Sequence, residues 1–111
     1  MNKERVSEKA RARNRYNKEA RRAKHYKVRY GITLVEKEER VKSQEYRCEN
    51  PGCQATDPGR HGWCTDHNHE TGQLRGELCH SCNTALGFLE ENPSRILGLI
   101  EYLKKYEKVL A

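Results

Sequence analysis

The first thirty residues have a helical pattern with few apolar positions. Residues 2–30 contain neither Gly nor Pro and are rich in Ala, Arg, Lys and Glu, a composition that favours helix. The apolar stripe is thin, so we expect a helix of roughly 40 Å that projects from the body or docks only partly. The stripe consists of Val6, Ala10, Tyr16, Ala20, Ala23 and Tyr30.

A second helix follows after a break. Gly31 predicts the end of the first helix, because glycine readily adopts the left-handed conformation that closes helices. Thr33 and Glu36 form a capping box, which predicts a helix over about 34–45. The apolar positions of this helix that can face inward are Leu34, Val35 and Val41.

Two strands and two further helices complete the pattern. Residues 63–66 and 73–78 suit strands that are joined by a broad hairpin loop. Residues 79 to about 91 have the pattern of a helix, and Asn92-Pro93 predicts the N-cap and first residue of another. The apolar positions of these two helices are Leu86, Phe88 and Leu89, then Ile96, Leu97, Ile100, Leu103 and Leu110.

The pattern predicts a small α+β fold with a helical arm at 1–30 and a body at 31–111. Apolar and charged residues each make up 34% of the 111 residues, so the body has little hydrophobic core. A fold of this kind needs a bound metal or disulfide bonds to stabilise it. Zinc is favoured over disulfides, because the five cysteines are odd in number and the chain starts with charged residues. No apolar run is long enough for a membrane helix, so we expect an intracellular, cytoplasmic protein without a membrane partner.

Positive charge is concentrated in the arm. Residues 1–29 hold twelve Lys and Arg against three Glu, a net charge of +9, whereas the whole chain carries +6. Such an arm favours a polyanionic partner, most simply nucleic acid, although a solvated helix would have the same composition. The candidate DNA-binding residues are Arg11, Arg13, Arg15, Lys18, Arg21, Arg22, Lys24 and, outside the arm, Arg75.

Two cysteine pairs have the spacing of a structural zinc site. Cys48 and Cys53 flank a Pro-Gly turn, and two residues separate Cys79 from Cys82. Four thiolates close a tetrahedral shell, so His61 and His80 are not needed as ligands. Cys64, in the middle of a predicted strand, is expected in the core.

The candidate catalytic residues lie between the cysteine pairs and, in the case of Asn83, directly after the second pair. A hairpin packed on a helix can bring Asp66 close to Asn83, and these oxygen donors suit Mg²⁺. For hydrolysis of a phosphodiester, His67 is placed to take a proton from the attacking water, and His69 is placed to contact the phosphate group that is cleaved. The alternative is that all four are turn and cap residues of a non-catalytic, zinc-dependent DNA-binding module.

Two sequence strings resemble the recombination endonuclease VII family of phage-type HNH nucleases. The strings are Asp66-His67-Asn68-His69-Glu70-Thr71-Gly72 and Leu74-Arg75-Gly76-Glu77-Leu78-Cys79-His80-Ser81-Cys82-Asn83-Thr84-Ala85-Leu86-Gly87. The resemblance implies a zinc-stabilised ββα-metal (HNH, His-Me finger) nuclease. In such an enzyme Cys48, Cys53, Cys79 and Cys82 hold Zn²⁺, Asp66 and Asn83 hold catalytic Mg²⁺ or Mn²⁺, and His67 is the general base that His69 assists.

The resemblance also implies a substrate and a setting. The expected partner is duplex DNA, with branched DNA and a homodimer as further options, in the cytoplasm of a phage-infected or prophage-bearing bacterium. Asn68 stands where the family often has Asp, at a position that we do not assign to the metal. The family's junction-resolving member has a long C-terminal extension that this chain lacks after Ala111, so the resemblance implies cleavage and leaves junction resolution open. The arm is expected to supply the DNA-binding surface instead.

Overall fold

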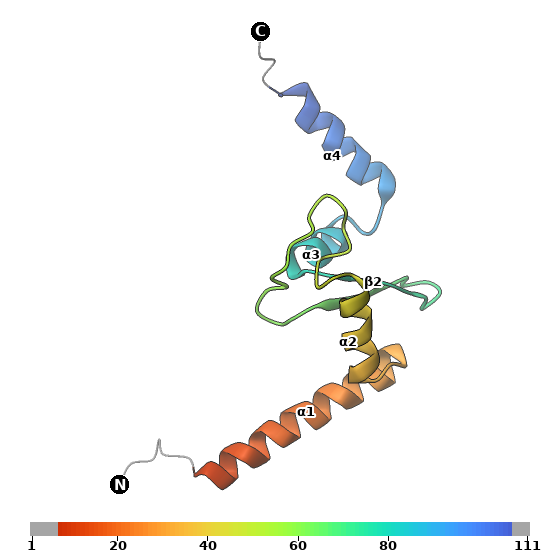
Figure 1. Ribbon diagram of the computed structural model, residues 1–111. Coiled ribbons are helices and arrows are strands. Elements are labelled where there is room, and N and C mark those ends of the chain that lie inside the picture. Colours follow the sequence, from red (N-terminus) through yellow and green to blue (C-terminus); the bar gives the residue numbers. More distant parts are fainter. Residues whose placement is uncertain (1–6, 108–111) are drawn as a thin grey trace.

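The computed structural model describes residues 7–107, which form four helices and one two-stranded sheet (Figure 1). Val6 and Leu110, which the sequence placed on helix faces, lie outside these residues. The elements are α1 (Glu8–Tyr30), α2 (Leu34–Ser43), β1 (Cys64–His67), β2 (Leu74–Leu78), α3 (His80–Phe88) and α4 (Pro93–Lys105). The prediction of a small α+β fold with a ββα core is confirmed, because the hairpin β1–β2 leads directly into α3.

The predicted helix boundaries are confirmed where a cap defines them. Gly31 closes α1 with a left-handed φ of 71°. The predicted capping box is present at the start of α2. The Glu36 backbone N–H donates to the Thr33 hydroxyl, and the Thr33 backbone N–H donates to the Glu36 carboxylate. Asn92 caps α4 by accepting from the backbone N–H groups of the first turn. These caps satisfy N–H groups that a helix start otherwise leaves unpaired.

Two helices end earlier than the sequence predicted, and each is followed by residues with positive φ. After α2, Glu45 and Tyr46 both have a φ of 57°. After α3, Glu90 and Glu91 have φ values of 53° and 54°. Non-glycine residues seldom adopt this conformation, so residue type alone does not predict such turns.

The hairpin contains a β-bulge at Asp66, one of the predicted metal ligands. Thr65 pairs with Glu77 and His67 pairs with Leu74, so that two residues of β2 lie opposite Asp66. A bulge increases the local twist and redirects side chains, and bulges are frequent near active sites. This bulge places Arg75 next to Asp66.

The loop of the hairpin is organised by Asn68. Its side-chain oxygen accepts from the backbone N–H groups of Glu70 and Thr71. Its backbone N–H donates to the Gln73 carbonyl, and its own carbonyl accepts from Gly72. Asn68 therefore has a structural role in the turn, which agrees with its exclusion from the predicted metal ligands.

The core is small and lies around the start of α3. Buried apolar side chains come from α2, the cysteine turn, β2 and the segment before α2. These residues are Ile32, Val41, Cys48, Leu78 and Cys79. The expectation that Val35 faces inward is wrong, since its side chain is 68% exposed. The inward position on α2 belongs to Lys37, one turn before Val41.

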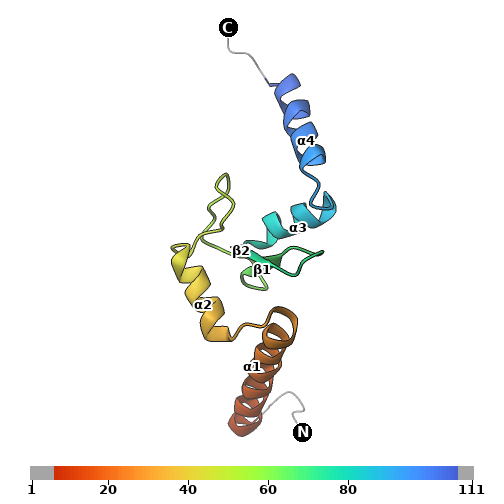
Figure 2. The same cartoon turned by 90° about the vertical axis from the view of Figure 1, so that its right-hand side faces the viewer.

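The two terminal helices extend from opposite sides of the central ββα core in both views (Figures 1 and 2). Most of α1 is exposed, as expected for a helix that docks partly, and its half-buried residues are Ala10, Ala23, Tyr26 and Tyr30. Large apolar side chains of α4, including Leu97, Ile100 and Leu103, are exposed. No helix within residues 7–107 combines the length and hydropathy that crossing a bilayer requires.

A buried ionic network joins α2 to the sheet. The carboxylate of Glu77, which is fully buried, accepts from Lys37 Nζ at 2.6 Å, Arg40 Nε at 3.1 Å and Thr65 Oγ1 at 3.0 Å. Lys37 Nζ also donates to the Trp63 carbonyl at 2.9 Å. Such a network holds the strand that carries Asp66 in one register against α2.

Removing the charge of Glu77 is expected to destabilise the protein strongly. Glu77→Gln leaves the Lys37 ammonium and the Arg40 guanidinium without their carboxylate, a change that typically costs about 3–5 kcal/mol at a buried pair. Urea unfolding of the zinc-loaded protein measures the loss. Glu38→Gln, the same substitution at an exposed position of α2, is the matched control. Equal unfolding free energies for the two variants would contradict the role given to the network.

Candidate active site and metal centre

The four predicted zinc ligands come together at the start of α3. The sulfur atoms of Cys48, Cys53, Cys79 and Cys82 all lie within 4.8 Å of one another. A tetrahedral zinc with Zn–S bonds of about 2.3 Å requires sulfur separations of about 3.8 Å. The Sγ atoms of Cys53 and Cys79 are 3.9 Å apart, so the cluster fits such an ion.

Local hydrogen bonds give the cysteine turn its shape. The Asn50 side-chain oxygen accepts from the Gly52 backbone N–H, and the Asn50 carbonyl accepts from that of Cys53. The Asn50 side-chain amide donates to Cys82 Sγ at 3.3 Å, and the Cys79 backbone N–H donates to Cys48 Sγ at 3.4 Å. Both bonds join the two cysteine pairs, as expected for sulfurs that share one ion.

The thiols of the cluster differ in acidity. The backbone N–H of Cys82 hydrogen-bonds to the Cys79 sulfur and lowers the pKa of that thiol. Burial raises the pKa of Cys82 to about 12, so metal binding at this sulfur has to displace a proton.

The remaining cysteine and two histidines lie outside this cluster, as predicted. The group of sulfurs within 4.8 Å does not include Cys64. The expectation that Cys64 lies in the core is wrong, since its side chain is only half-buried. Burial raises the pKa of its thiol, which favours the protonated form. His80 is exposed, and its ring centroid lies 6.4 Å from that of His61.

The four predicted catalytic residues line one cavity of about 310 Å³. Asp66 and His67 come from the end of β1, His69 from the hairpin loop, and Asn83 from the first turn of α3. The hairpin packs on α3, and this packing brings residues of both elements together. Residues of α1 complete the wall, which sequence reasoning did not anticipate. They are Tyr26, Arg29 and Tyr30.

The carboxylate of Asp66 is buried and engaged by Arg75. Arg75 Nε donates to Asp66 Oδ2 at 2.7 Å, and Arg75 Nη2 donates to Oδ1 at 3.0 Å. This hydrogen bonding raises the pKa of Arg75 above its ordinary value, so the guanidinium stays charged. A carboxylate offers about four lone-pair sites, and Arg75 uses two of them, which leaves capacity for a metal ion.

Arg75 thus has intramolecular partners, although it was predicted to bind DNA. Its Nη2 also donates to the His67 carbonyl at 3.1 Å and to the Glu91 carboxylate. The guanidinium therefore fixes the backbone of His67 as well as the Asp66 side chain.

The two histidines are adjacent and held from both sides. Their ring centroids are 4.5 Å apart, and the ring of Tyr30 meets that of His67 edge-on at 5.4 Å. His69 Nε2 lies 3.6 Å from Glu91 Oε1. Glu91 was missed by the sequence reasoning, because it reaches the site from a left-handed turn after α3 that no periodicity predicts.

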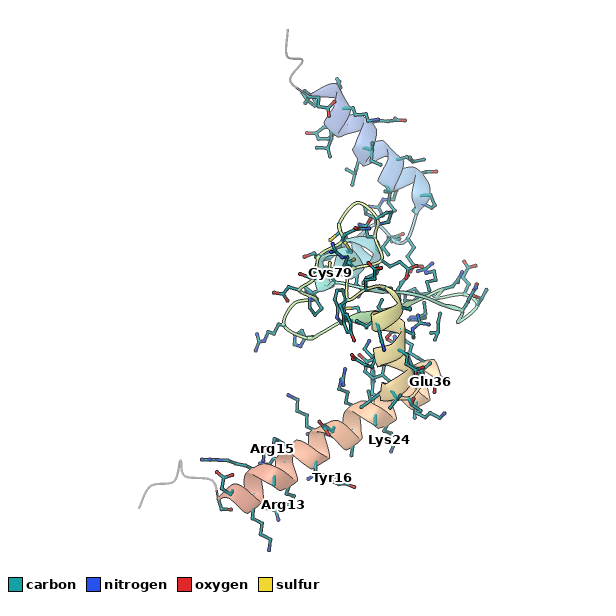
Figure 3. The ribbon with its side chains drawn as sticks, in the orientation of Figure 1. Arg13, Arg15, Tyr16, Lys24, Glu36 and Cys79 are labelled. Atoms are coloured by element: carbon teal, nitrogen blue, oxygen red, sulfur yellow. The ribbon has the colours of Figure 1, made fainter. Side chains whose placement is uncertain are left out.

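The basic side chains of α1 form a separate cationic surface. Figure 3 shows Arg13, Arg15 and Lys24 extending from different sides of the helix. All three are exposed, and the described part of α1 carries only Glu8 and Glu19 as acidic residues. The surface suits a polyanion that contacts the helix over several turns.

Comparisons with known proteins show which family the chain resembles. The family model described as recombination endonuclease VII matches residues 23–105. The Gene 59 protein of Mycobacterium phage D29 is 36% identical over 77 residues, which cover 68% of this chain and 46% of that protein. The crystal structure of the beta-beta-alpha-Me type II restriction endonuclease Hpy99I is 33% identical, with a TM-score of 0.47. That match covers 76% of this chain and 48% of the other, so the chain spans about half the length of both relatives.

Proposed function

Because the chain belongs to the recombination endonuclease VII family, we propose that it is a metal-dependent DNA endonuclease that hydrolyses phosphodiester bonds. One observation carries the proposal: Asp66, His67, His69 and Asn83 line a single cavity. A carboxylate, an amide and two imidazoles around one space are the groups that hydrolysis of an anionic phosphodiester needs.

Asp66 and Asn83 are the residues that would hold the catalytic ion. Their oxygen atoms suit Mg²⁺ or Mn²⁺, and Arg75 orients the Asp66 carboxylate. Such an ion, when bound, offsets the negative charge that develops on the phosphate and on the leaving oxygen.

His67 acts as the general base in this proposal. Its imidazole takes a proton from a water molecule, and the water oxygen attacks phosphorus as the bond to the 3′ oxygen breaks. The leaving oxygen then takes up a proton, so the products carry a 5′-phosphate and a 3′-hydroxyl. His69 contacts a phosphate oxygen, and Glu91 holds His69 in place.

The cysteine cluster has a structural role in the proposal. Zn²⁺ bound by Cys48, Cys53, Cys79 and Cys82 joins the turn after α2 to the start of α3. Since Asn83 directly follows Cys82, the same ion also fixes the helix end that carries one catalytic residue.

DNA is the proposed partner, and α1 supplies most of the contacts. The residues proposed to bind phosphates along α1 are Arg11, Arg13, Arg15, Lys18, Arg21, Arg22 and Lys24. Duplex DNA suits a straight cationic helix, and branched DNA is the second option. The phage relative supports action in the cytoplasm of an infected bacterium. A homodimer stays a prediction, which light scattering of the purified chain tests.

A non-catalytic DNA-binding module is the second candidate function, favoured by the exposed cationic surface of α1. It predicts salt-sensitive DNA binding without cleavage under any metal condition. The two functions therefore differ in one measurable outcome.

A cleavage panel tests the proposed function. Supercoiled plasmid, linear duplex, a flap and a four-way junction are each incubated with zinc-loaded protein and Mg²⁺, Mn²⁺ or no added divalent ion. We expect nicking or cutting of at least one substrate with Mg²⁺ or Mn²⁺ only. Intact DNA in every reaction, together with salt-dependent binding, would support the second candidate instead.

A further inference from the structure

The C-terminal end of α1 forms one wall of the active-site cavity. Tyr26, Arg29 and Tyr30 occupy positions i, i+3 and i+4, which lie on one helix face, and all three line the cavity of about 310 Å³. Residues of α1 on the other faces, such as Lys27 and Tyr16, do not line it. The arm and the catalytic residues therefore meet at this face.

This end of α1 is anchored to the buried ionic network. Lys37 Nζ, which the Glu77 carboxylate holds, lies 4.5 Å from the centroid of the Tyr26 ring. A cation over an aromatic face is attracted to the ring, most strongly when it is desolvated. The Tyr26 and Tyr30 rings are in turn 5.6 Å apart. The contacts thus run from the α2–sheet network through two tyrosines toward the cavity.

Tyr30 contacts the proposed general base directly. Its ring centroid lies 5.4 Å from that of His67, with an interplanar angle of 62°. His69 packs on His67 with the ring centroids 4.5 Å apart. An imidazole between two rings has little freedom to rotate, and a base works best when its orientation is fixed in advance.

Arg29 brings an available cation to the cavity. Its Nε donates to Tyr30 Oη at 3.2 Å, and no ion pair within residues 7–107 involves Arg29. Arg75, by contrast, is paired with both Asp66 and Glu91. Of these two guanidinium groups, Arg29 is therefore the one with charge to offer a substrate phosphate.

We propose that Arg29 binds the phosphate that is cleaved and that Tyr30 positions the His67 imidazole, so that the last turn of α1 is part of the active site. The inference rests on the proposed nuclease function. It gives the arm two separate roles, because its first turns bind DNA at a distance whereas its last turn acts at the reacting phosphate.

Charge-matched variants test Arg29. Arg29→Gln and Lys27→Gln each remove one positive charge from the same helix turn, but only Arg29 lines the cavity. Initial rates are measured over a range of DNA concentrations with the zinc-loaded full chain. We expect Lys27→Gln to raise KM with little change in kcat, and Arg29→Gln to lower kcat by roughly tenfold or more, as the loss of a donor to developing charge does. Equal kcat values for the two variants would overturn the role of Arg29.

Tyr30 is tested with Tyr30→Phe, Tyr30→Leu and the exposed Tyr16→Leu. We expect Leu to lower kcat several-fold, because it removes the ring beside His67. Phe keeps the ring and loses only the hydroxyl that accepts from Arg29, so it should lower kcat less than Leu does. Tyr16→Leu should leave kcat unchanged. A kcat for Tyr30→Leu equal to that of Tyr16→Leu would refute the positioning role.

A measurement without DNA separates this inference from the proposed function. In the zinc-loaded wild-type protein, nuclear Overhauser contacts are expected between ring protons of Tyr30 and His67. The absence of these Overhauser contacts would overturn the Tyr30–His67 contact even if DNA is cleaved. The measurement uses only wild-type protein, so it does not depend on the folding of a variant. Wild-type protein that shows the contact and cuts no DNA would instead refute the nuclease function and, with it, the roles given to both residues.

Discussion

A His67→Ala variant is expected to lose DNA cleavage by about 10²- to 10⁴-fold, the usual contribution of a positioned general base. The imidazole lies in the cavity beside Asp66, His69 and Asn83, where a water molecule can approach both the base and a bound phosphate. Zinc content and DNA affinity should stay close to wild type, because His67 is neither in the cysteine cluster nor on the exposed part of α1. Single-turnover cleavage rates measure the effect on chemistry.

His80→Ala is the matched control for this prediction. His80 is also a histidine of the ββα core, but it is exposed and lies outside the cavity. We expect its variant to cleave at the wild-type rate. Added imidazole should partly restore cleavage to His67→Ala by supplying the missing base. A His67→Ala protein that cuts as fast as His80→Ala would rule out His67 as the base.

Local signals predicted most of the secondary structure. Local hydrogen bonds, to residues within five positions along the chain, define the helix ends at Gly31, at Thr33 with Glu36, and at Asn92. Both strands were predicted to within one residue of their limits. These features depend on near neighbours, so the sequence contains the information that determines them.

The cysteine cluster and the group of candidate catalytic residues could be predicted, because the chain between their members has a simple hairpin–helix topology. Two cysteine pairs on either side of a hairpin can reach one ion, and the four sulfurs do lie within 4.8 Å. A hairpin that leads directly into a helix places Asp66 and Asn83 around the same cavity. The sequence thus identified which residues meet, although not the contacts that orient them.

The contacts that orient the candidate catalytic side chains were not predicted, because they depend on irregular backbone conformations and on buried charged residues. Arg75 reaches Asp66 because a bulge sets two residues of β2 opposite one of β1. Glu91 reaches the site from a turn with positive φ, and Tyr30 from the end of a helix that was expected mainly to bind DNA. Lys37 is buried because Glu77 is buried opposite it, a pairing across forty residues that hydrophobic periodicity does not encode.

Replacing one zinc ligand is expected to unfold the protein, and Cys82→Ser is the change that we would make. A structural zinc contributes about 10–16 kcal/mol of apparent binding free energy, whereas small domains have net stabilities of about 5–15 kcal/mol. The core around the cluster is too small to compensate, because two of its five buried apolar residues, Cys48 and Cys79, are themselves proposed ligands. Loss of cleavage in this variant would therefore reflect loss of the fold.

Cys64→Ser provides the control for the same chemical change outside the cluster. The Cys64 side chain is only half-buried and lies outside the cluster, so its replacement should shift the melting temperature by only a few degrees, as roughly 1 kcal/mol would. Zinc content by mass spectrometry and thermal unfolding by circular dichroism compare the two variants. We expect one zinc per chain and a cooperative transition for Cys64→Ser, and neither for Cys82→Ser. A Cys82→Ser protein that retains one zinc and melts with Cys64→Ser would show that the cluster does not hold the ββα core together.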